Sequence, residues 1–262
     1  MDIFGFDSAG FLSFVLTLMR VSVLIFFLPF FGGDSIPPQV KAALCLVLSL
    51  AIWPAGALPG EVFPAHPFHL ALIFLGELIL GLGLALLVNF VFAGMQLGAE
   101  LIGFQMGFSM LSLMDPSNPG QQLVITSFLA QMVALALFLS LDGHLLLLSS
   151  LLGSFRLIGP GQLLLESRAL EDMLKLSAGM FVLAVKVAGP VLACLFLVEL
   201  ALALMARVAP QMNLLVLGFP IKIGVGFFFF GVIFSLIGLY LDDFVRGIPS
   251  MFNNFMRAVK GG

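Results

Sequence analysis

The chain has 262 residues, of which 61% are hydrophobic and only 10% are charged. Soluble domains contain roughly 45–50% apolar and about 25% charged residues, so this composition excludes an ordinary soluble domain and indicates an integral membrane protein. The formal net charge is −3 and the basic residues are scattered, which excludes an electrostatic argument for nucleic-acid binding. We expect an all-α, polytopic membrane fold.

The first apolar run, residues 11–31, has the length of a membrane-spanning helix. Arg20 lies near its middle, where an arginine is costly unless it faces protein, water or an acidic partner. We therefore expect Arg20 to make a buried contact. A second, shorter helix is predicted at residues 40–53, and the proline-rich segment 54–67 predicts a connector.

The next apolar run, residues 68–113, is more than twice the length that a single span requires. It can be two spans joined near residues 89–94, or long helices that leave the bilayer inside a protein assembly. Four of its glycines recur at intervals of four or five residues and predict close helix packing. They are Gly94, Gly98, Gly103 and Gly107.

A methionine stripe follows, because Met106, Met110 and Met114 recur every four residues. Pro116 biases Asp115 out of the helical conformation, so the stripe is expected to end there. One interpretation of this stretch is a deformable closure of a membrane pore, since flexible thioethers repack at small cost. The alternative, which the residues by themselves favour, is that the stripe packs against a neighbouring helix.

The C-terminal half predicts a span at residues 123–141, an exposed connector at 154–172, and a long helical hairpin at 173–240. Pro210, Gln211 and Asn213 form the expected corner, and Gly218 and Pro220 an expected interruption. Three glycines at heptad spacing predict another close-packing face. These glycines are Gly224, Gly231 and Gly238.

Charged residues inside apolar runs are expected to be buried or paired, because unpaired charges are costly in a membrane. Glu199 and Lys222 lie equally far from the hairpin corner and are candidates for a buried ion pair; the alternative is that each meets a different subunit. Glu77 and Glu100 are interpreted as structural pairs, with proton transfer as the alternative. The full set is Arg20, Glu77, Glu100, Lys186, Glu199, Arg207 and Lys222.

Catalytic and cofactor motifs are missing from the sequence. It contains no phosphate-binding glycine loop, no CxxC pair and no HExxH sequence. We therefore expect a protein that is not an enzyme, with no metal and no cofactor.

Several motifs together resemble the FliR/SctT export-gate family of type III secretion. The most specific are RVAPQMN at residues 207–213 and GFPIKI at residues 218–223. Supporting motifs are Gly76-Glu77, Gly107-Phe108-Ser109, Asp115-Pro116 and Leu141-Asp142-Gly143-His144. The resemblance covers essentially the whole chain and implies one export-gate domain over residues 1–262. Its sections are residues 1–122, 123–172, 173–240 and 241–262, with a plug-like loop at about 106–122.

The resemblance also implies a function and partners. A family member joins FliP and FliQ subunits in the bacterial inner membrane, with FlhB at the cytoplasmic side, and passes unfolded flagellar proteins through a channel in the basal body. The implied closure residues are Met106, Phe108, Met110, Leu111, Leu113, Met114, Asp115 and Pro116. Basic residues in the tail place the C-terminus in the cytoplasm. The alternatives are an injectisome subunit and a secondary transporter that uses Glu77, Glu100 and Lys186.

Overall fold

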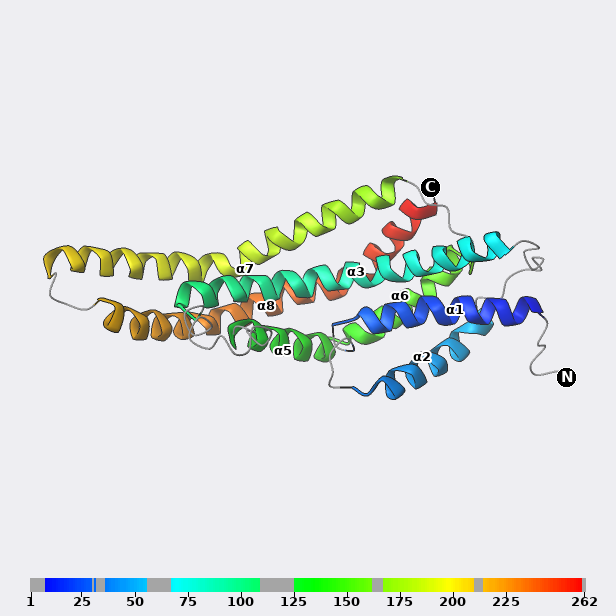
Figure 1. The fold of residues 1–262 in the computed structure, drawn as a ribbon, viewed down its shortest axis with the longest axis horizontal. Coiled ribbons are helices and arrows are strands. Elements are labelled where there is room, and N and C mark those ends of the chain that lie inside the picture. The colour runs from blue at the N-terminus through cyan, green and yellow to red at the C-terminus, as the bar shows by residue number, and fades with distance from the viewer. Residues whose placement is uncertain are drawn as a thin grey trace. The chain divides into compact units, whose positions relative to one another are not determined.

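The computed structural model describes residues 8–29, 31, 36–55, 67–108, 125–161, 167–209 and 214–260. All regular elements in these ranges are helices, which confirms the all-α prediction (Figure 1). They are α1 (Ser8–Phe27), α2 (Pro38–Ile52), the 3-10 helix η1 (Trp53–Ala55), α3 (Pro67–Met106), α5 (Ile125–Ser140), α6 (Gly143–Leu157), α7 (Ser167–Val208) and α8 (Leu214–Lys260).

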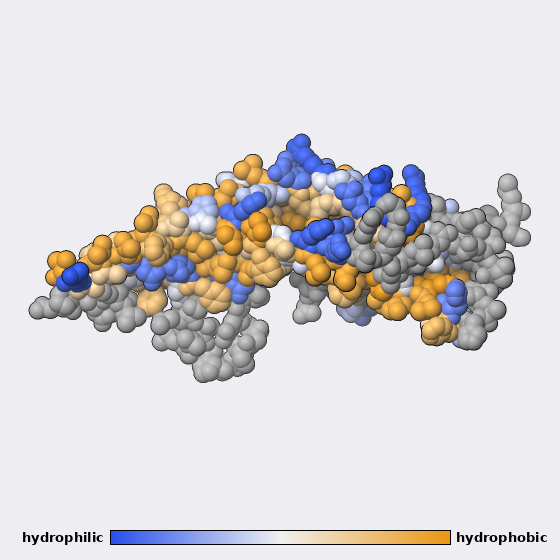
Figure 2. Space-filling model, turned by 90° about the horizontal axis from the view of Figure 1, so that it is seen from above, coloured by the Kyte–Doolittle hydropathy of each residue, from blue (hydrophilic) through white to orange (hydrophobic). Residues whose placement is uncertain are grey.

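Four helices in the described part of the chain are long and apolar enough to cross a membrane. These segments are Gly10–Phe27, Pro67–Met106, Leu170–Val208 and Leu217–Lys260, and the pair α5 and α6 makes a fifth if it counts as one broken span. Apolar residues cover much of the described surface in Figure 2, as expected for a chain surrounded by lipid or by other apolar helices. The chain is a polytopic membrane protein.

The long apolar run at residues 68–113 forms one helix as far as Met106, so it is not two spans joined near residues 89–94. The predicted interruption at Gly218 and Pro220 is wrong, because α8 is continuous from Leu214 to Lys260. Pro220 lies close to the start of α8, where few hydrogen bonds precede it and the loss of one N–H donor does not end the helix.

The described chain divides into two compact units that do not follow the order of the sequence. Unit 1 contains residues 1–90, 142–177 and 245–262, and unit 2 contains residues 91–141 and 178–244. The long helices α3, α7 and α8 therefore each contribute to both units. Each unit is described separately below.

Unit 1 is built around α1, whose buried face packs against the first half of α3 and against α2. A Cβ on Gly81 of α3 would lie 3.0 Å from the Arg20 carbonyl oxygen, so the backbones of α1 and α3 are close at this point. Phe14 contacts Trp53 edge to face, with ring centroids 6.0 Å apart. The resulting core is apolar, with fully buried side chains at Leu16, Leu24, Leu80 and Leu84.

Unit 2 is built around the second half of α3. A Cβ on Gly94 or Gly98 would lie 2.8 Å from a carbonyl oxygen of α7, that of Met180 or of Ala184 respectively. Glycines four residues apart thus meet carbonyls four residues apart, so α3 and α7 run in the same direction. On another side of α3, Phe92 contacts Phe138 of α5 edge to face at 5.5 Å.

The heptad glycines of α8 have little contact with the described part of the chain. A Cβ on Gly224 or Gly231 would have no neighbour within 4 Å, and one on Gly238 would only reach the Leu137 side chain at 3.9 Å. Among the described residues no helix packs closely on these positions, so their role as a close-packing face stays a prediction. Gly226 of α8 is in close contact, because a Cβ there would lie 2.5–2.7 Å from the Met106 side chain.

Candidate functional site

Arg20 and Glu77 form a buried ion pair in unit 1. Arg20 Nε donates to Glu77 Oε2 at 2.6 Å and Nη2 donates to Oε1 at 2.9 Å, and the two side chains are 0% and 1% exposed. The planar guanidinium matches the carboxylate with two parallel hydrogen bonds, which is the strongest form of this pair. The structure thus gives Arg20 an acidic partner on α3.

The end of α6 and the residues just after it complete this polar cluster. Arg20 Nη1 donates to Ser154 Oγ at 3.3 Å and to the Ile158 carbonyl oxygen at 3.1 Å, and the guanidinium carbon lies 4.3 Å from the Phe155 ring centroid. The Gly161 N–H donates to Glu77 Oε1 at 2.7 Å. Gly161 has φ of 85°, a left-handed conformation that favours glycine.

Sequence analysis missed these contacts because it interpreted residues 154–172 as an exposed connector. Ser154 and Ile158 are instead buried. The available signal was the spacing of Ser150 and Ser154, which places two polar side chains on one face of an apolar helix. Both oxygens of Glu77 are occupied, so the cluster holds three segments of unit 1 together and presents no free group for chemistry.

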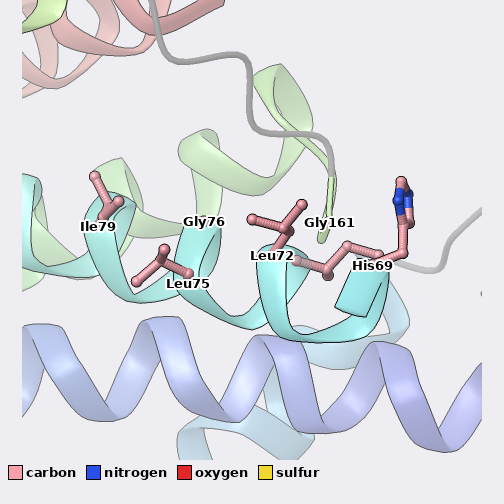
Figure 3. A pocket seen from close by; sticks show the side chains of 7 residues that line it. His69, Leu72, Leu75, Gly76, Ile79 and Gly161 are labelled. Carbon is pink, nitrogen blue, oxygen red and sulfur yellow. The ribbon is translucent and has the colours of Figure 1, made fainter. Parts of the chain in front are cut away.

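A surface groove of about 310 Å³ lies beside this cluster. Figure 3 shows its lining along α3 from Ile79 to His69, with Gly161 on a separate segment and the His69 ring at one end. The complete lining is His69, Leu72, Ile73, Leu75, Gly76, Ile79 and Gly161. One histidine among aliphatic side chains supplies no converging set of polar groups, so the groove does not fit a charged or polar substrate.

Three helices of unit 2 meet at Glu199. Lys222 Nζ of α8 donates to Glu199 Oε1 at 2.9 Å, and Gln105 Nε2 of α3 donates to Glu199 Oε2 at 2.8 Å. The predicted partners Glu199 and Lys222 are therefore together, and Gln105 joins them. They are not buried, however, because the Glu199 and Lys222 side chains are 50% and 19% exposed. We call these three residues the Glu199 junction.

The end of α3 is held just beside this junction. The Met106 side chain is fully buried and occupies the space left by Gly226. Gly107 has φ of 92°, and a Cβ there would lie 2.6 Å from the Phe219 ring, so both conformation and space require glycine. Phe108 contacts Phe227 edge to face at 6.0 Å.

Met106 therefore packs inside unit 2, as in the alternative interpretation of the methionine stripe. Its side chain is buried against Gly226 of α8. The other predicted closure residues after Phe108 lie outside the described residues, as do three residues of the predicted hairpin corner. These are Met110, Leu111, Leu113, Met114, Asp115, Pro116, Pro210, Gln211 and Asn213.

Three other charged residues, predicted to be buried or paired, are more exposed than a buried residue would be. Lys186 and Arg207 are exposed on α7, and Glu100 is half-buried on α3. The physical reason is that α7 contacts its neighbours through one face only, so its opposite face is not covered by the described chain. Within that part of the chain no group of three or more His, Cys, Asp or Glu side chains is placed to hold a metal ion.

Taken together, the fold and these sites define a class of protein. It is an all-α polytopic membrane protein with a fully buried ion pair in unit 1, a partly exposed ion pair in unit 2, and large apolar side chains exposed in both units.

Comparison with known proteins places the chain more narrowly. A family described as "Bacterial export proteins, family 1" matches residues 11–248. The flagellar biosynthetic protein FliR of Escherichia coli (strain K12) is 32% identical over 225 residues, which cover 86% of this chain and 85% of that protein. FliR of Bacillus subtilis (strain 168) is 32% identical over 228 residues, covering 86% of this chain and 87% of that protein. FliR of Aquifex aeolicus (strain VF5) is 25% identical over 251 residues, covering 95% of each. The chain belongs to the FliR family of bacterial export proteins.

Proposed function

We propose that the chain is a non-enzymatic subunit of the flagellar type III export gate in the bacterial inner membrane. In this proposal it joins FliP and FliQ to form the channel through which unfolded flagellar proteins cross the membrane, and FlhB binds at the cytoplasmic side. The basic residues Arg246, Arg257 and Lys260 near the end of the chain favour a cytoplasmic C-terminus.

The observation that carries the proposal is the family match over residues 11–248, which includes almost all of the described helices. The physical features of unit 2 agree with it. Large apolar side chains of α7 and α8 are exposed, including Phe196, Leu204 and Phe228. Such surfaces are typical of a protein–protein or membrane interface, as a subunit of a membrane complex requires.

The alternative as a proton or solute transporter relied on Glu77, Glu100 and Lys186. Glu77 is held by Arg20 and by the Gly161 N–H, so it is a structural carboxylate with no site for a substrate. This arrangement supports the export-gate proposal over the transporter.

We further propose that the segment beginning at Phe108 and continuing to Pro116 closes the channel between export events. Apolar constrictions can block ions by excluding water, and flexible methionines can repack around varied polypeptides. Met106 is left out of this closure because it is buried against α8. Gly107 and the Phe108 ring contact fix the point at which the segment leaves α3.

Deletion of residues 109–118 tests the proposal. The variant is expected to co-purify with FliP and FliQ as the unchanged chain does, while the ion conductance of membranes that contain the complex increases. A variant with a Gly/Ser linker of equal length separates loss of apolar side chains from loss of length, and Gly231→Ala, at an open position of α8, is the matched control. Unchanged conductance in the deletion would overturn the closure, and failure of the unchanged chain to co-purify with FliP and FliQ would overturn the export-gate assignment.

A further inference from the structure

One face of α7 in unit 2 has no partner among the described residues. The six residues named in the next sentence follow one another at intervals of three, four or eight residues, and so lie on one side of the helix. We call Gly179, Val182, Lys186, Gly189, Leu197 and Leu200 the α7 outer face. Val182 and Leu197 are 53% and 64% exposed. The opposite side of α7, which includes Ala184 and Val187, is buried against α3.

Lys186 is the only charge on a long apolar stretch of this helix. The nearest formal charges along α7 are Lys175 and Glu199, and the residues between them and Lys186 are apolar or small. At 1.5 Å per residue, about 17–20 Å of helix separates Lys186 from either charge. Lys186 is exposed, and no described residue of the chain pairs with it. This contrasts with Arg20 and Lys222, which both have carboxylate partners.

An ammonium at the middle of an apolar stretch requires an acidic or polar partner, because its desolvation is otherwise costly. If this stretch crosses the bilayer, the phosphates lie about 15 Å away on either side, since the hydrocarbon core is about 30 Å thick. A lysine side chain does not reach that far from the middle of the helix. A carboxylate on another membrane helix therefore fits better than a lipid headgroup.

The two glycines of the α7 outer face support the same type of partner. A Cβ on Gly179 or on Gly189 would have no neighbour within 4 Å, so both backbone positions are open. They flank Lys186 at seven and three residues along the helix. Small residues allow a second helix to approach the backbone closely, whereas lipid chains pack against larger side chains equally well.

We propose that the α7 outer face binds a transmembrane helix of another membrane subunit, with an Asp or Glu of that helix paired to Lys186. The inference rests on the proposed function, because an export gate supplies other membrane subunits. It goes further by assigning the contact face on this chain and the chemistry of the partner.

Photo-crosslinking from the full-length chain in native membranes tests the position of the partner. A crosslinking residue at Val182 is expected to form an adduct with an apolar helix of another membrane protein, within one helical turn of an Asp or Glu. The same residue at Leu183, which packs against Gly94, is expected to react within the chain. An adduct from Val182 only to lipid, only to its own chain, or to a segment without an acidic residue overturns the inference.

Charge exchange tests the ion pair. Lys186→Glu is expected to reduce recovery of the cross-linked partner about tenfold, because it opposes two like charges at the interface. Lys186→Arg is expected to retain recovery, and replacement of the partner carboxylate by lysine is expected to restore it for Lys186→Glu. Lys175→Glu is the matched control, because Lys175 is an exposed lysine of α7 in unit 1. Full recovery with Lys186→Glu, or no restoration by the exchange, overturns the pair.

These outcomes separate the inference from the proposed function. If the unchanged chain co-purifies with FliP and FliQ but Val182 reacts only with lipid, the export-gate assignment stands and the α7 contact is wrong. If the chain co-purifies with neither, the assignment is wrong, while an adduct to an acidic membrane helix would still support the α7 contact.

Discussion

Units 1 and 2 each contain an ion pair that joins two different helices, and the two pairs differ in burial. Unit 1 buries Arg20 and Glu77 completely and satisfies them with a bidentate pair, two further acceptors for the arginine and a backbone donor for the glutamate. Unit 2 leaves Lys186 exposed and keeps its ion pair at the surface, with the Glu199 side chain 50% exposed.

This difference indicates which charges stabilise the chain itself. Removing one partner of a buried ion pair lowers the free energy of unfolding strongly, because the other charge is left buried without a counterion. An exposed ion pair adds little to the free energy of unfolding, because water and salt screen it. Lys186 and the Glu199 junction are therefore better suited to recognising other subunits than to stabilising the fold. Substitutions in the two units should separate these roles.

The largest effect is expected at the buried pair. Arg20→Met leaves the Glu77 carboxylate buried without its counterion and should lower the free energy of unfolding by about 3–5 kcal/mol. Adding Glu77→Gln removes the uncompensated charge and keeps an acceptor for the Gly161 N–H, so the double variant should recover a large part of the loss. Denaturant unfolding in mixed detergent micelles measures both.

Arg156→Ala provides the matched control for this prediction, because Arg156 is an exposed arginine of α6 in the same unit. Its unfolding free energy should stay near that of the unchanged chain. If Arg20→Met were as mild as Arg156→Ala, the buried pair would not distinguish unit 1 from unit 2.

An intermediate effect is expected from the helix-packing glycines of unit 2. In Gly98→Ala the new Cβ would lie 2.8 Å from the Ala184 carbonyl oxygen, so the α3 and α7 backbones must move apart. The expected cost is about 1–3 kcal/mol of unfolding free energy. Gly231→Ala adds a Cβ in open space and should stabilise the chain by about 0.4–1 kcal/mol. Equal effects of the two substitutions would contradict the packing described here.

The smallest effect on stability is expected at the Glu199 junction. A double-mutant cycle of Glu199→Ala and Lys222→Ala should give a coupling of about 0.2–1 kcal/mol, reduced further by high salt, because the pair is partly exposed. Both single changes should nevertheless lower co-purification of FliP and FliQ, with the double change less than additive. Strictly additive losses would show that the ion pair does not contribute to assembly. A coupling free energy as large as that of Arg20 and Glu77 would contradict the difference between the buried and the exposed pair.

The sequence determined the class of environment and many of the elements. An apolar fraction of 61% with few charges requires a membrane or other apolar surroundings, and the long apolar runs predicted α3 and most of α7. The helix α8 instead continues past the predicted end at residue 240 to Lys260. Equal distance from the hairpin corner made Glu199 and Lys222 candidates for a pair, because two antiparallel helices place such residues side by side, and the structure joins them. Spacing by four was enough to predict that Gly94 and Gly98 pack closely.

Only the tertiary structure decided which distant segments meet. Glu77 is 57 residues from Arg20 and Ser154 is 134 residues from it, and no local pattern encodes contacts at that separation. The same limit applies to the burial of Met106 and to the open positions of Gly224 and Gly231. Periodicity places a residue on one side of its helix, but burial depends on whether another helix covers that side.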